Sequence, residues 1–241
     1  MALDTCTAYF LGTVGYRLAW EIQNDIADQI KKNSRSNTIL LLQHPSVYTI
    51  GRRGSRADIF LSDQELKNLD IDLIETDRGG EVTYHGPGQM IVYPIIDIRK
   101  LGGPSKFVGL LESTIIDVLG QYQLDSFQVC ERIGVWISSQ NTKRDELIDE
   151  KKIAAIGLRF SQGISTHGFA LNVNPDLRLF GQIVPCGIKD RGVTSLAEEL
   201  GKEVDYDLLT QRVIQSLSKY LGVDIVYGSA AELFNGSNSP I

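Results

Sequence analysis

The sequence predicts an α+β fold in which helices flank a mixed β-sheet, within a single domain over residues 1–234 followed by a flexible tail, 235–241. Apolar residues recur with a helical period in some segments, whereas other segments are short apolar runs rich in β-branched residues. Several of these runs follow one another across short turns, which favours a mixed sheet. No repeat or linker divides the 241 residues, a length that suits one large domain.

Periodicity and capping residues place the helices. Leu18, Ile22 and Ile26 recur at i+4 spacing, so residues 15–31 are expected to form an amphipathic helix. Ser62 and Glu65 have the spacing of a capping box at the start of a short helix. Three further helices are predicted: one capped by Ser105 with Val108, Leu111, Ile115 and Val118 on its buried face, a short one that starts at Ser195 and Glu198, and one marked by Leu209, Val213, Leu217 and Tyr220.

Short apolar runs bounded by turn residues place the strands. Pro94 interrupts one of these runs, and because proline cannot donate a sheet hydrogen bond, we expect a bulge or a sheet edge there. Cys6 lies near a chain end that we expect to be frayed, and the polar residues 139–151 are expected to form a hairpin loop or a mobile insertion. The predicted strands are residues 38–43, 47–50, 72–76, 89–98, 127–129, 134–138, 152–157 and 166–173.

The composition argues against several classes of protein. The chain has 24 basic and 30 acidic residues, and the net charge of −6 argues against nucleic acid as the main partner. Three cysteines are too few for a disulfide framework, and the three histidines and three cysteines show no metal-binding spacing, so no metal site is expected. No apolar run approaches the roughly 20 residues that cross a bilayer, and the first residues lack the pattern of a secretory signal. We therefore expect a cytoplasmic protein with no nucleic-acid or membrane partner.

The glycine-rich run at residues 78–89, RGGEVTYHGPGQ, is a candidate binding site. Its glycines allow the backbone to approach a ligand closely, and Arg78 can donate to a carbonyl or to an anion. The run matches neither a Walker A loop nor the GxGxxG fingerprint, so phosphate binding does not follow from it. An ordinary tight loop, in which Tyr84 packs and His85 is hydrogen-bonded, explains the same residues equally well.

Cys186 is a candidate nucleophile. It lies between Pro185 and Gly187 on a predicted turn, which favours exposure. A reactive cysteine must be a thiolate and therefore needs a cation or a hydrogen-bond donor nearby. Lys152, at the entry to an apolar strand, is a candidate cation and base, and His167 is a second candidate base. A small loop cysteine, a solvated lysine and a structural histidine remain the simpler interpretations.

These runs resemble the lipoyl(octanoyl) transferase family. The run RGGEVTYHGPGQ is similar to the signature of that family, and further blocks between about residues 38 and 200 are similar to it in the same order. These blocks are LQHPSVYTIGR at 42–52, KIAAIG at 152–157, STHGFALN at 165–172 and IVPCGI at 183–188, followed by TSL at 194–196.

The resemblance implies both a fold and an activity. The fold would be that of the catalytic domain of biotin/lipoate protein ligases. The activity would be transfer of an octanoyl group from octanoyl-acyl carrier protein, through a cysteine thioester and without a cofactor, to a lysine of lipoyl domains. The acceptors would be the lipoyl domains of 2-oxoacid dehydrogenases and glycine-cleavage H protein.

The resemblance also implies which residues act. The catalytic residues of the family fall on Cys186 and Lys152. Its acyl-binding segments fall on Arg78, Gly79, Gly80, Glu81, Val82, Thr83, Tyr84, His85, Ala155, Ile156, Gly157, Gly168, Phe169 and Ala170.

Two other functions remain open. An ATP-dependent lipoate-protein ligase of the same fold would activate a free acid and would not need Cys186, and a non-catalytic acyl-binding protein would have no use for the pair of Cys186 and Lys152. Because acyl carrier proteins and lipoyl domains are typically acidic, as this chain is, docking would need a local basic patch. Arg52, Arg53 and Arg56 are the candidate patch, and a solvated loop is the alternative.

Overall fold

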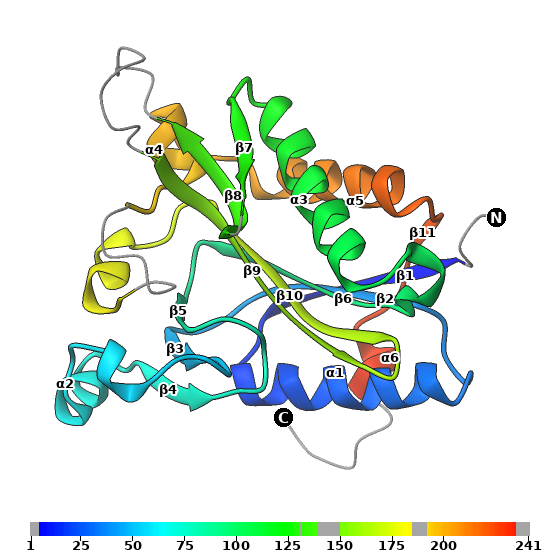
Figure 1. The fold of residues 1–241 in the computed structure, drawn as a ribbon, viewed down its shortest axis with the longest axis horizontal. Coiled ribbons are helices and arrows are strands. Elements are labelled where there is room, and N and C mark those ends of the chain that lie inside the picture. Colours follow the sequence, from blue (N-terminus) through cyan, green and yellow to red (C-terminus); the bar gives the residue numbers. More distant parts are fainter. Residues whose placement is uncertain (1–4, 131, 139–149, 185–191, 235–241) are drawn as a thin grey trace.

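The structure is a computed structural model that describes residues 5–130, 132–138, 150–184 and 192–234. Within these ranges an eight-stranded mixed sheet and a three-stranded sheet are accompanied by helices (Figure 1), which confirms the predicted α+β class. The large sheet has the strand order β11-β1-β2-β6-β10-β9-β8-β7. Its strands are β1 Cys6–Thr13, β2 Thr38–Gln43, β6 Gln89–Ile95, β7 Ser126–Val129, β8 Arg132–Ser138, β9 Glu150–Ser161, β10 Ile164–Asn172 and β11 Ile225–Tyr227.

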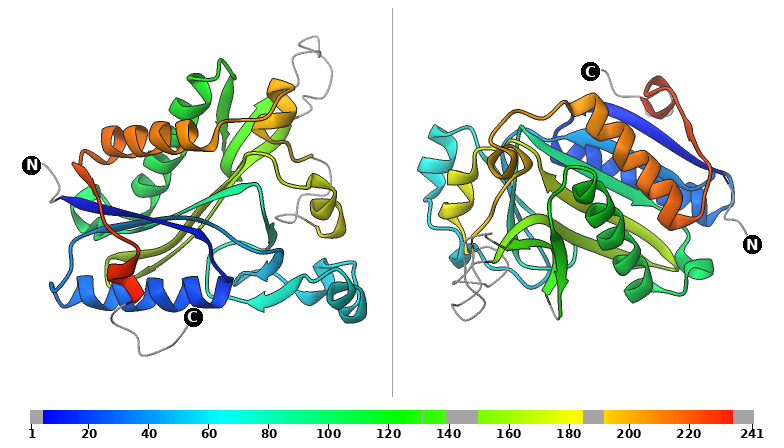
Figure 2. Two further views of the ribbon diagram at one scale, coloured as in Figure 1. Left: turned by 180° about the vertical axis from the view of Figure 1, so that it is seen from behind. Right: turned by 90° about the horizontal axis from the view of Figure 1, so that it is seen from above.

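Helices cover both faces of the large sheet. Figure 2 shows α3 (Pro104–Gly120) and α5 (Tyr206–Leu221) together over one face and α1 (Tyr16–Lys31) against the other. Each face has its own core, because α3 and α5 bury Leu111 and Val213 in one apolar cluster, whereas α1 buries Ile26 in a second. The shorter helices are α2 Asp63–Asn68, α4 Leu196–Leu200 and α6 Ala231–Phe234, and 3₁₀ turns occur at Arg56–Asp58, Ile98–Leu101 and Leu177–Gln182.

The predicted helices are all present, with two corrections: α3 starts earlier than expected, and Leu18, expected on the apolar face of α1, is 47% exposed. Ser62 and Glu65 form both hydrogen bonds of a capping box at α2, and Ser195 accepts the N–H of Glu198 at α4. The predicted cap Ser105 is wrong, because α3 begins one residue earlier, at Pro104, after Gly103. Proline suits the first turn of a helix because its φ is already helical and its missing N–H would have had no partner there.

Cys6 lies in a strand, so the expectation of a frayed end at this residue is wrong. Cys6 opens β1, which lies between β11 and β2 and pairs with both in parallel. The Cys6 side chain is fully buried, and burial raises the pKa of its thiol to about 12. Partners far along the chain, not local sequence, therefore make this segment a strand.

Pro94 lies in the centre of the large sheet, where the register of β6 with both neighbours is unshifted, so the edge and the bulge are both wrong. Its strand, β6, pairs with β2 on one side and β10 on the other. Opposite Pro94 across the ladder lies His167, whose backbone has a positive φ of 57°. The N–H of His167 donates to the side chain of Gln23 on α1, at 2.6 Å, and not to the sheet. The proline thus lies at a break in the β6–β10 ladder.

The long β9–β10 hairpin extends past its neighbour β8. Residues 150 and 151 already belong to β9, so the predicted loop at 139–151 ends earlier than expected, and 139–149 lie outside the described residues. Beyond the first residue of β8, the N–H of Gly79 donates to Leu158 O, which places the glycine-rich loop on the free edge of β9. That loop leads into the small sheet, which consists of β3 Val47–Ile50, β4 Asp72–Glu75 and β5 Val82–His85.

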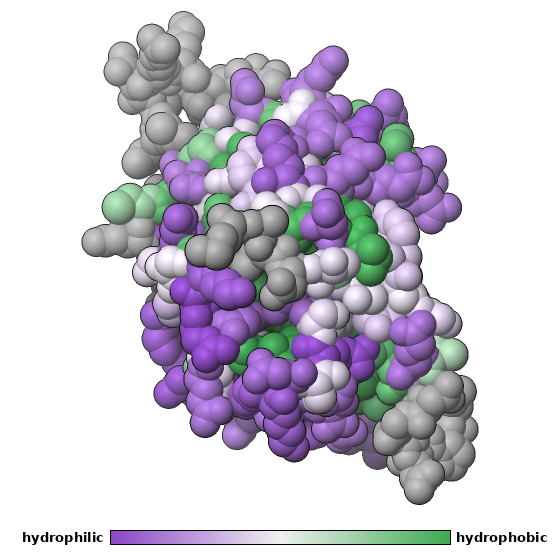
Figure 3. All heavy atoms as spheres, turned by 90° about the vertical axis from the view of Figure 1, so that its right-hand side faces the viewer, coloured by the Kyte–Doolittle hydropathy of each residue, from purple (hydrophilic) through white to green (hydrophobic). Residues whose placement is uncertain are grey.

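The face of the molecule shown in Figure 3 is mostly polar. On the side shown in Figure 3, hydrophilic residues dominate and hydrophobic ones appear in separate small areas. Scattered apolar residues of this kind are normal on a protein surface. Among the described helices, none combines the length and the apolar character that a membrane crossing requires.

Candidate active site

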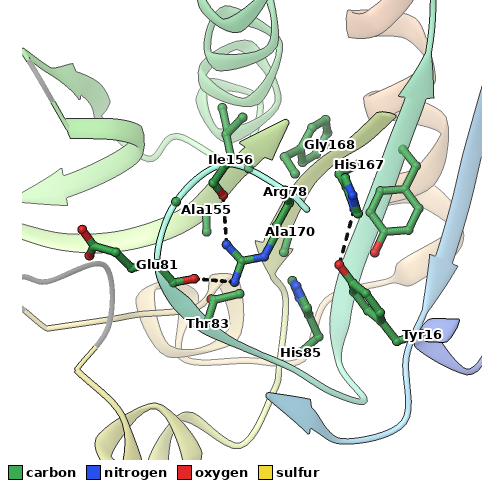
Figure 4. Close-up of a pocket in the computed structure, with 15 residues that line it drawn as sticks. Tyr16, Arg78, Glu81, Thr83, His85, Ala155, Ile156, His167, Gly168 and Ala170 are labelled. Atoms are coloured by element: carbon green, nitrogen blue, oxygen red, sulfur yellow. Dashed lines mark hydrogen bonds between the residues drawn. The ribbon is translucent and has the colours of Figure 1, made fainter. Parts of the chain in front are cut away.

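A cavity lies between the glycine-rich loop and the β9–β10 hairpin (Figure 4). It encloses about 50 Å³, and about 460 Å³ when the space open to solvent is included. Its lining consists of Tyr16, Arg78, Gly79, Gly80, Glu81, Thr83, His85, Tyr93, Ala155, Ile156, Gly157, His167, Gly168, Phe169 and Ala170. Most of the residues predicted to bind substrate thus lie around one cavity, although they come from separate parts of the chain.

Val82 and Tyr84 belong to the predicted set, but their side chains do not line the cavity. The strand alternation of β5 turns both into the apolar cluster of the small sheet, beside Tyr48 and Phe180. The hydroxyl of Tyr84 is hydrogen-bonded to Ser46.

Arg78 binds its own loop. Its guanidinium is buried and donates to the carbonyl oxygens of Thr49, Gly79 and Glu81, at 2.7 to 3.0 Å. Figure 4 shows the side chain held in this way beneath the loop. Because charged donors form strong hydrogen bonds, Arg78 fixes the path of the backbone around the cavity. Its described hydrogen bonds are with these carbonyls and with the hydroxyl of Thr49, whose Oγ1 accepts from Nε and Nη2 at 3.0 and 2.8 Å.

Glycines permit the close contact between this loop and β9. A Cβ at Gly79 would lie 3.0 Å from Leu158 O, and a Cβ at Gly157 would lie 3.0 Å from Gly79 O. Gly80 has a positive φ of 92°, which a residue with a side chain rarely adopts. The loop therefore packs backbone against backbone.

Two amide groups of the loop are available to a ligand. Within the described residues, the N–H groups of Gly80 and Glu81 donate to no protein atom. Both residues line the cavity. Backbone N–H groups that face a cavity can stabilise a developing oxyanion.

The inner end of the cavity is polar and aromatic, which the sequence did not predict. Tyr16 from α1 stacks against His85 and His167, and Tyr93 from β6 lies across from His167. His44 lies behind them, where its Nδ1 donates to Val14 O at 2.6 Å and its Nε2 accepts from the Tyr93 hydroxyl at 2.7 Å. Tyr16 and Tyr93 reach the site from distant elements, so no local motif could have identified them.

Burial keeps these histidines neutral. It lowers the pKa of His44 to about 4 and that of His85 well below its usual value. Burial also lowers the pKa of His167, although its hydrogen bond to Asp77, at 2.8 Å, opposes this shift. Arg159 donates to the other oxygen of Asp77 at 2.6 Å, so the carboxylate is shared. His167 is thus held by its neighbours, as the structural interpretation expected.

Lys152 borders a second cavity that adjoins the first. This cavity has a volume of about 600 Å³ and is lined by both Lys152 and Arg132. The Lys152 side chain is 9% exposed, its Nζ donates to Ile133 O at 3.4 Å, and it lies 4.7 Å from the centre of the Trp136 ring. The residues that line both cavities are Gly79, Gly80, Glu81, Ile156 and Gly157.

Two charged atoms beside the second cavity have no partner. In the described part of the chain, Arg132 Nη1 and Glu81 Oε2 are buried without a hydrogen bond, and both residues line this cavity. An unpaired buried polar atom is costly, so these two atoms are available to a polar ligand.

Cys186 lies outside the described residues. The chain before it ends at Val184, whose N–H donates to Asp58 O, and the chain after it resumes at Gly192, whose carbonyl accepts the N–H of Lys152 at 3.0 Å. Thr194 N–H donates back to Lys152 O. The described chain therefore resumes, at Gly192, directly beside Lys152.

The three arginines of the candidate basic patch differ in their contacts. Arg56 donates hydrogen bonds to Ile59 O, Leu61 O and Asp63, whereas Arg52 and Arg53 are exposed, and Arg53 borders the second cavity.

The described ranges contain no group of three or more histidine, cysteine or acidic residues that could hold a metal ion.

Known proteins of similar sequence are acyltransferases by name. The octanoyltransferase of Acidobacterium capsulatum is 41% identical over 221 residues, which cover 88% of this chain and 87% of that protein. The octanoyltransferase of Chloroflexus aggregans is 42% identical over 217 residues, which cover 89% and 94%.

Solved structures of similar fold are ligases, at much lower identity. Lipoate-protein ligase A bound with ATP has a TM-score of 0.71 and 16% identity, over 95% of this chain and 91% of that one. Biotin protein ligase from Aquifex aeolicus in complex with biotin and ATP has a TM-score of 0.52 and 15% identity, over 89% and 69%. These similarities confirm the predicted fold.

The sequence model of a catalytic-domain family covers most of the chain. It matches residues 15–218, a range that contains every described residue around the two cavities. Together with relatives about 40% identical over nearly their whole length, this match decides the assignment. The chain belongs to the lipoyl protein ligase A/B catalytic domain family.

Proposed function

We propose that this protein transfers an octanoyl group from an acyl thioester to a lysine of a lipoyl domain. The observation that carries the proposal is the pair of adjoining cavities, one lined by small and apolar residues of β9 and β10 and the other bordered by Lys152. The relatives named octanoyltransferase support the same reaction. The donor is octanoyl-acyl carrier protein, and the acceptors are lipoyl domains of 2-oxoacid dehydrogenases and glycine-cleavage H protein.

The acyl tail occupies the first cavity. Ala155, Ile156, Phe169 and Ala170 give it an apolar wall, which suits a hydrocarbon chain. An eight-carbon chain exceeds the enclosed 50 Å³, so it also fills the space that is open to solvent. The reacting carbonyl then lies at the glycine-rich loop, which borders both cavities.

The thiol arm of the donor occupies the second cavity. Amide groups along such an arm can accept from Arg132 Nη1 and donate to Glu81 Oε2, which are the two unpartnered atoms there. A cavity of about 600 Å³ is within the usual size of a small-molecule site. With the thiol arm bound in this cavity, binding of the donor does not require the acidic carrier protein and this acidic protein to attract each other through their net charges.

The reaction proceeds in two transfers. The thiolate of Cys186 attacks the thioester carbonyl, the bond to the donor sulfur breaks, and the donor leaves as a thiol after taking up a proton. The acceptor lysine amine then attacks the acyl-enzyme, an amide bond forms, and the Cys186 sulfur leaves. Lys152, as an ammonium, stabilises the Cys186 thiolate and gives its proton to the departing donor sulfur, and as a neutral amine it then accepts the proton of the attacking acceptor amine. The N–H groups of Gly80 and Glu81 stabilise the oxyanion in both transfers.

The first test is acyl-enzyme formation without ATP. Incubation with octanoyl-acyl carrier protein should give a protein with one added octanoyl group by intact-mass spectrometry. Cys186→Ser should abolish this adduct, whereas Cys130→Ser should retain it, because Cys130 is exposed and lies outside both cavities. ATP-dependent attachment of free octanoate with no acyl-enzyme would establish a ligase in place of a transferase.

A further inference from the structure

We propose that Glu112 is a positioning residue that holds Lys152 through the peptide group between Ile133 and Gly134. The inference rests on the proposed function, because it assumes that Lys152 takes part in the transfer. Glu112 lies on α3, on the side of the sheet opposite α1, and borders neither cavity. It therefore acts only through other residues.

One peptide group connects the two side chains. The N–H of Gly134 donates to Glu112 Oε1 at 3.0 Å, in a buried hydrogen bond. The carbonyl of the same peptide group is Ile133 O, which accepts from Lys152 Nζ at 3.4 Å. Because the N–H and C=O of a trans peptide group point in opposite directions, the carboxylate and the ammonium bind its two ends.

The hydrogen bonds reinforce one another. A carboxylate that accepts from the N–H draws electron density toward the carbonyl oxygen, which makes Ile133 O a better acceptor for Lys152. If Glu112 is removed, the peptide loses its restraint and the carbonyl becomes a weaker acceptor. The position of Nζ then depends on its remaining contacts, including the ring of Trp136.

The burial of Glu112 carries an energetic cost. Glu112 is 8% exposed and stands beside the core residue Leu111, and burial raises the pKa of its carboxyl. A carboxyl group in such surroundings is expensive unless it is hydrogen-bonded. A smaller apolar residue would fill the position at lower cost if the only requirement were packing.

Gly134 holds the other side of the same arrangement. Its φ is +128°, and a Cβ there would lie 2.6 Å from Ala154 O and 3.4 Å from Lys152 Cε. A side chain at this position would therefore strain the peptide and press on the lysine stem. Gly134 and Glu112 thus fix one peptide group from its two sides.

The test compares substitutions of Glu112 in the full chain. Glu112→Leu removes the acceptor, whereas Glu112→Gln keeps a carbonyl oxygen for the Gly134 N–H. For octanoyl transfer, Glu112→Leu should lower kcat per folded molecule by roughly 10- to 100-fold, the range expected when a reacting group is misplaced by about 1 Å, with KM nearly unchanged. Glu112→Gln should retain most of the wild-type kcat.

A matched control comes from the same helix. Thr114 is fully buried on α3, and its hydroxyl bonds only to Leu110 O within the helix. Thr114→Val perturbs the α3 core without touching Gly134 and should leave kcat unchanged. Equal kcat per folded molecule in Glu112→Leu and the wild type would overturn the proposal, as would a loss in Thr114→Val equal to that in Glu112→Leu.

A second readout does not depend on turnover. Amine-acylating reagents followed by peptide mapping measure the labelling of Lys152 against its neighbour Lys151, which binds Glu198 and not the 133–134 peptide. The ratio should rise in Glu112→Leu and return toward wild type in Glu112→Gln. An unchanged ratio in folded Glu112→Leu refutes the inference.

Gly134→Ala and Glu112→Asp keep the proposal testable if Glu112→Leu fails to fold. Gly134→Ala perturbs the same peptide group from its other side, and Glu112→Asp keeps the charge but shortens the reach. Both should raise the labelling ratio, and an unchanged ratio in both overturns the inference. If the wild type forms no acyl-enzyme, the proposed function fails, while the labelling ratio still decides the role of Glu112.

Discussion

Pro94 and His167 face one another across β6 and β10, where neither contributes an N–H to the ladder between these strands. The same antiparallel register holds on both sides of them, with Val92 paired to Phe169 before the break and Asp97 bridged to Ile164 beyond it. Because proline has no N–H, the residue opposite it can turn away without loss of a hydrogen bond from that side. This gap lets His167 adopt its left-handed backbone and turn its ring toward Tyr16 and Asp77.

The first prediction concerns the residue that supports this turn. Gln23 is 1% exposed and accepts the N–H of His167, so Gln23→Leu leaves a buried donor without a partner. The free energy of unfolding should fall by about 1–3 kcal/mol, as measured in urea. Asn24→Leu on the exposed side of the same helix is the control and should change stability by less than about 0.5 kcal/mol. Equal effects of the two substitutions would contradict the role of Gln23.

The second prediction concerns acid stability. Burial lowers the pKa of His44 from 6.5 to about 4. Below pH 6.5 His44 is therefore protonated in the unfolded chain, whereas in the folded chain it stays neutral down to about pH 4. The stabilisation is therefore complete above pH 6.5 and is lost as the pH falls toward 4, by up to about 1.4 kcal/mol per pH unit from this group. Burial also lowers the pKa of His85, so His85 contributes further to the loss of stability at low pH.

Urea unfolding of the wild type and of His44→Gln across this pH range measures the effect. His44→Gln removes one titrating group and should lose stability less steeply between pH 6.5 and 4.5, although it is less stable at pH 7. Parallel pH profiles for the two proteins would show that His44 is not responsible.

The third prediction concerns acyl chain length. Ala155 projects toward the first cavity in Figure 4 and is only partly buried. Ala155→Leu adds volume where the tail is proposed to lie, so kcat/KM for an octanoyl donor should fall by roughly 10-fold or more, whereas that for a butyryl donor should change little. Steady-state assays with both donors provide the internal control. An equal loss with the two donors would place the tail elsewhere.

The fourth prediction is that substitution of Arg132 keeps or raises the stability of the protein but weakens binding of the donor. Among the described residues Arg132 Nη1 makes no hydrogen bond, so Arg132→Gln removes one unsatisfied buried donor and should leave the protein equally or more stable. If the donor arm binds there, the same change should raise KM for octanoyl-pantetheine about 5- to 10-fold, as expected for one lost hydrogen bond to a charged group. Thermal unfolding and initial rates measure the two effects.

The control for Arg132 comes from the exposed arginines. Arg52 is exposed and borders neither cavity, so Arg52→Gln should leave KM for this small donor unchanged. If charge reversal at Arg52 and Arg53 also leaves KM for acyl carrier protein unchanged, the basic patch does not dock the carrier.

The sequence predicted the elements with strong local signals and missed those that depend on distant partners. The capping boxes and the i+4 spacing in α1 are local, so α1, α2 and α4 were predictable. The strand at Cys6 depends on β2 and β11, more than 30 and 200 residues away, and was not predictable. The tolerance of Pro94 in a central strand likewise requires Gln23 and His167.

The candidate site divides in the same way. Glycines that pack backbone against backbone mark the loop at 78–81 in the sequence, because only glycine fits there. Tyr16 and Tyr93 are ordinary core positions in α1 and β6 by pattern, and only tertiary packing brings them to the cavity. The role of Glu112 could not be predicted either, because nothing in the sequence around a single acidic residue of a helix indicates its hydrogen-bond partner.

The contact between Gly79 and Leu158 has a consequence for solubility. Beyond the first residue of β8, the outer edge of β9 would present unpaired backbone groups. Strands of other molecules can pair with such an edge. The glycine-rich loop covers this edge with its own backbone. A side chain at Gly79 or Gly157 would lie about 3.0 Å from backbone oxygen and would push the loop away from this edge, which weakens its cover. Substitutions at these glycines are thus liable to cause self-association as well as loss of the cavity, so the same few residues protect the protein in solution and shape its site.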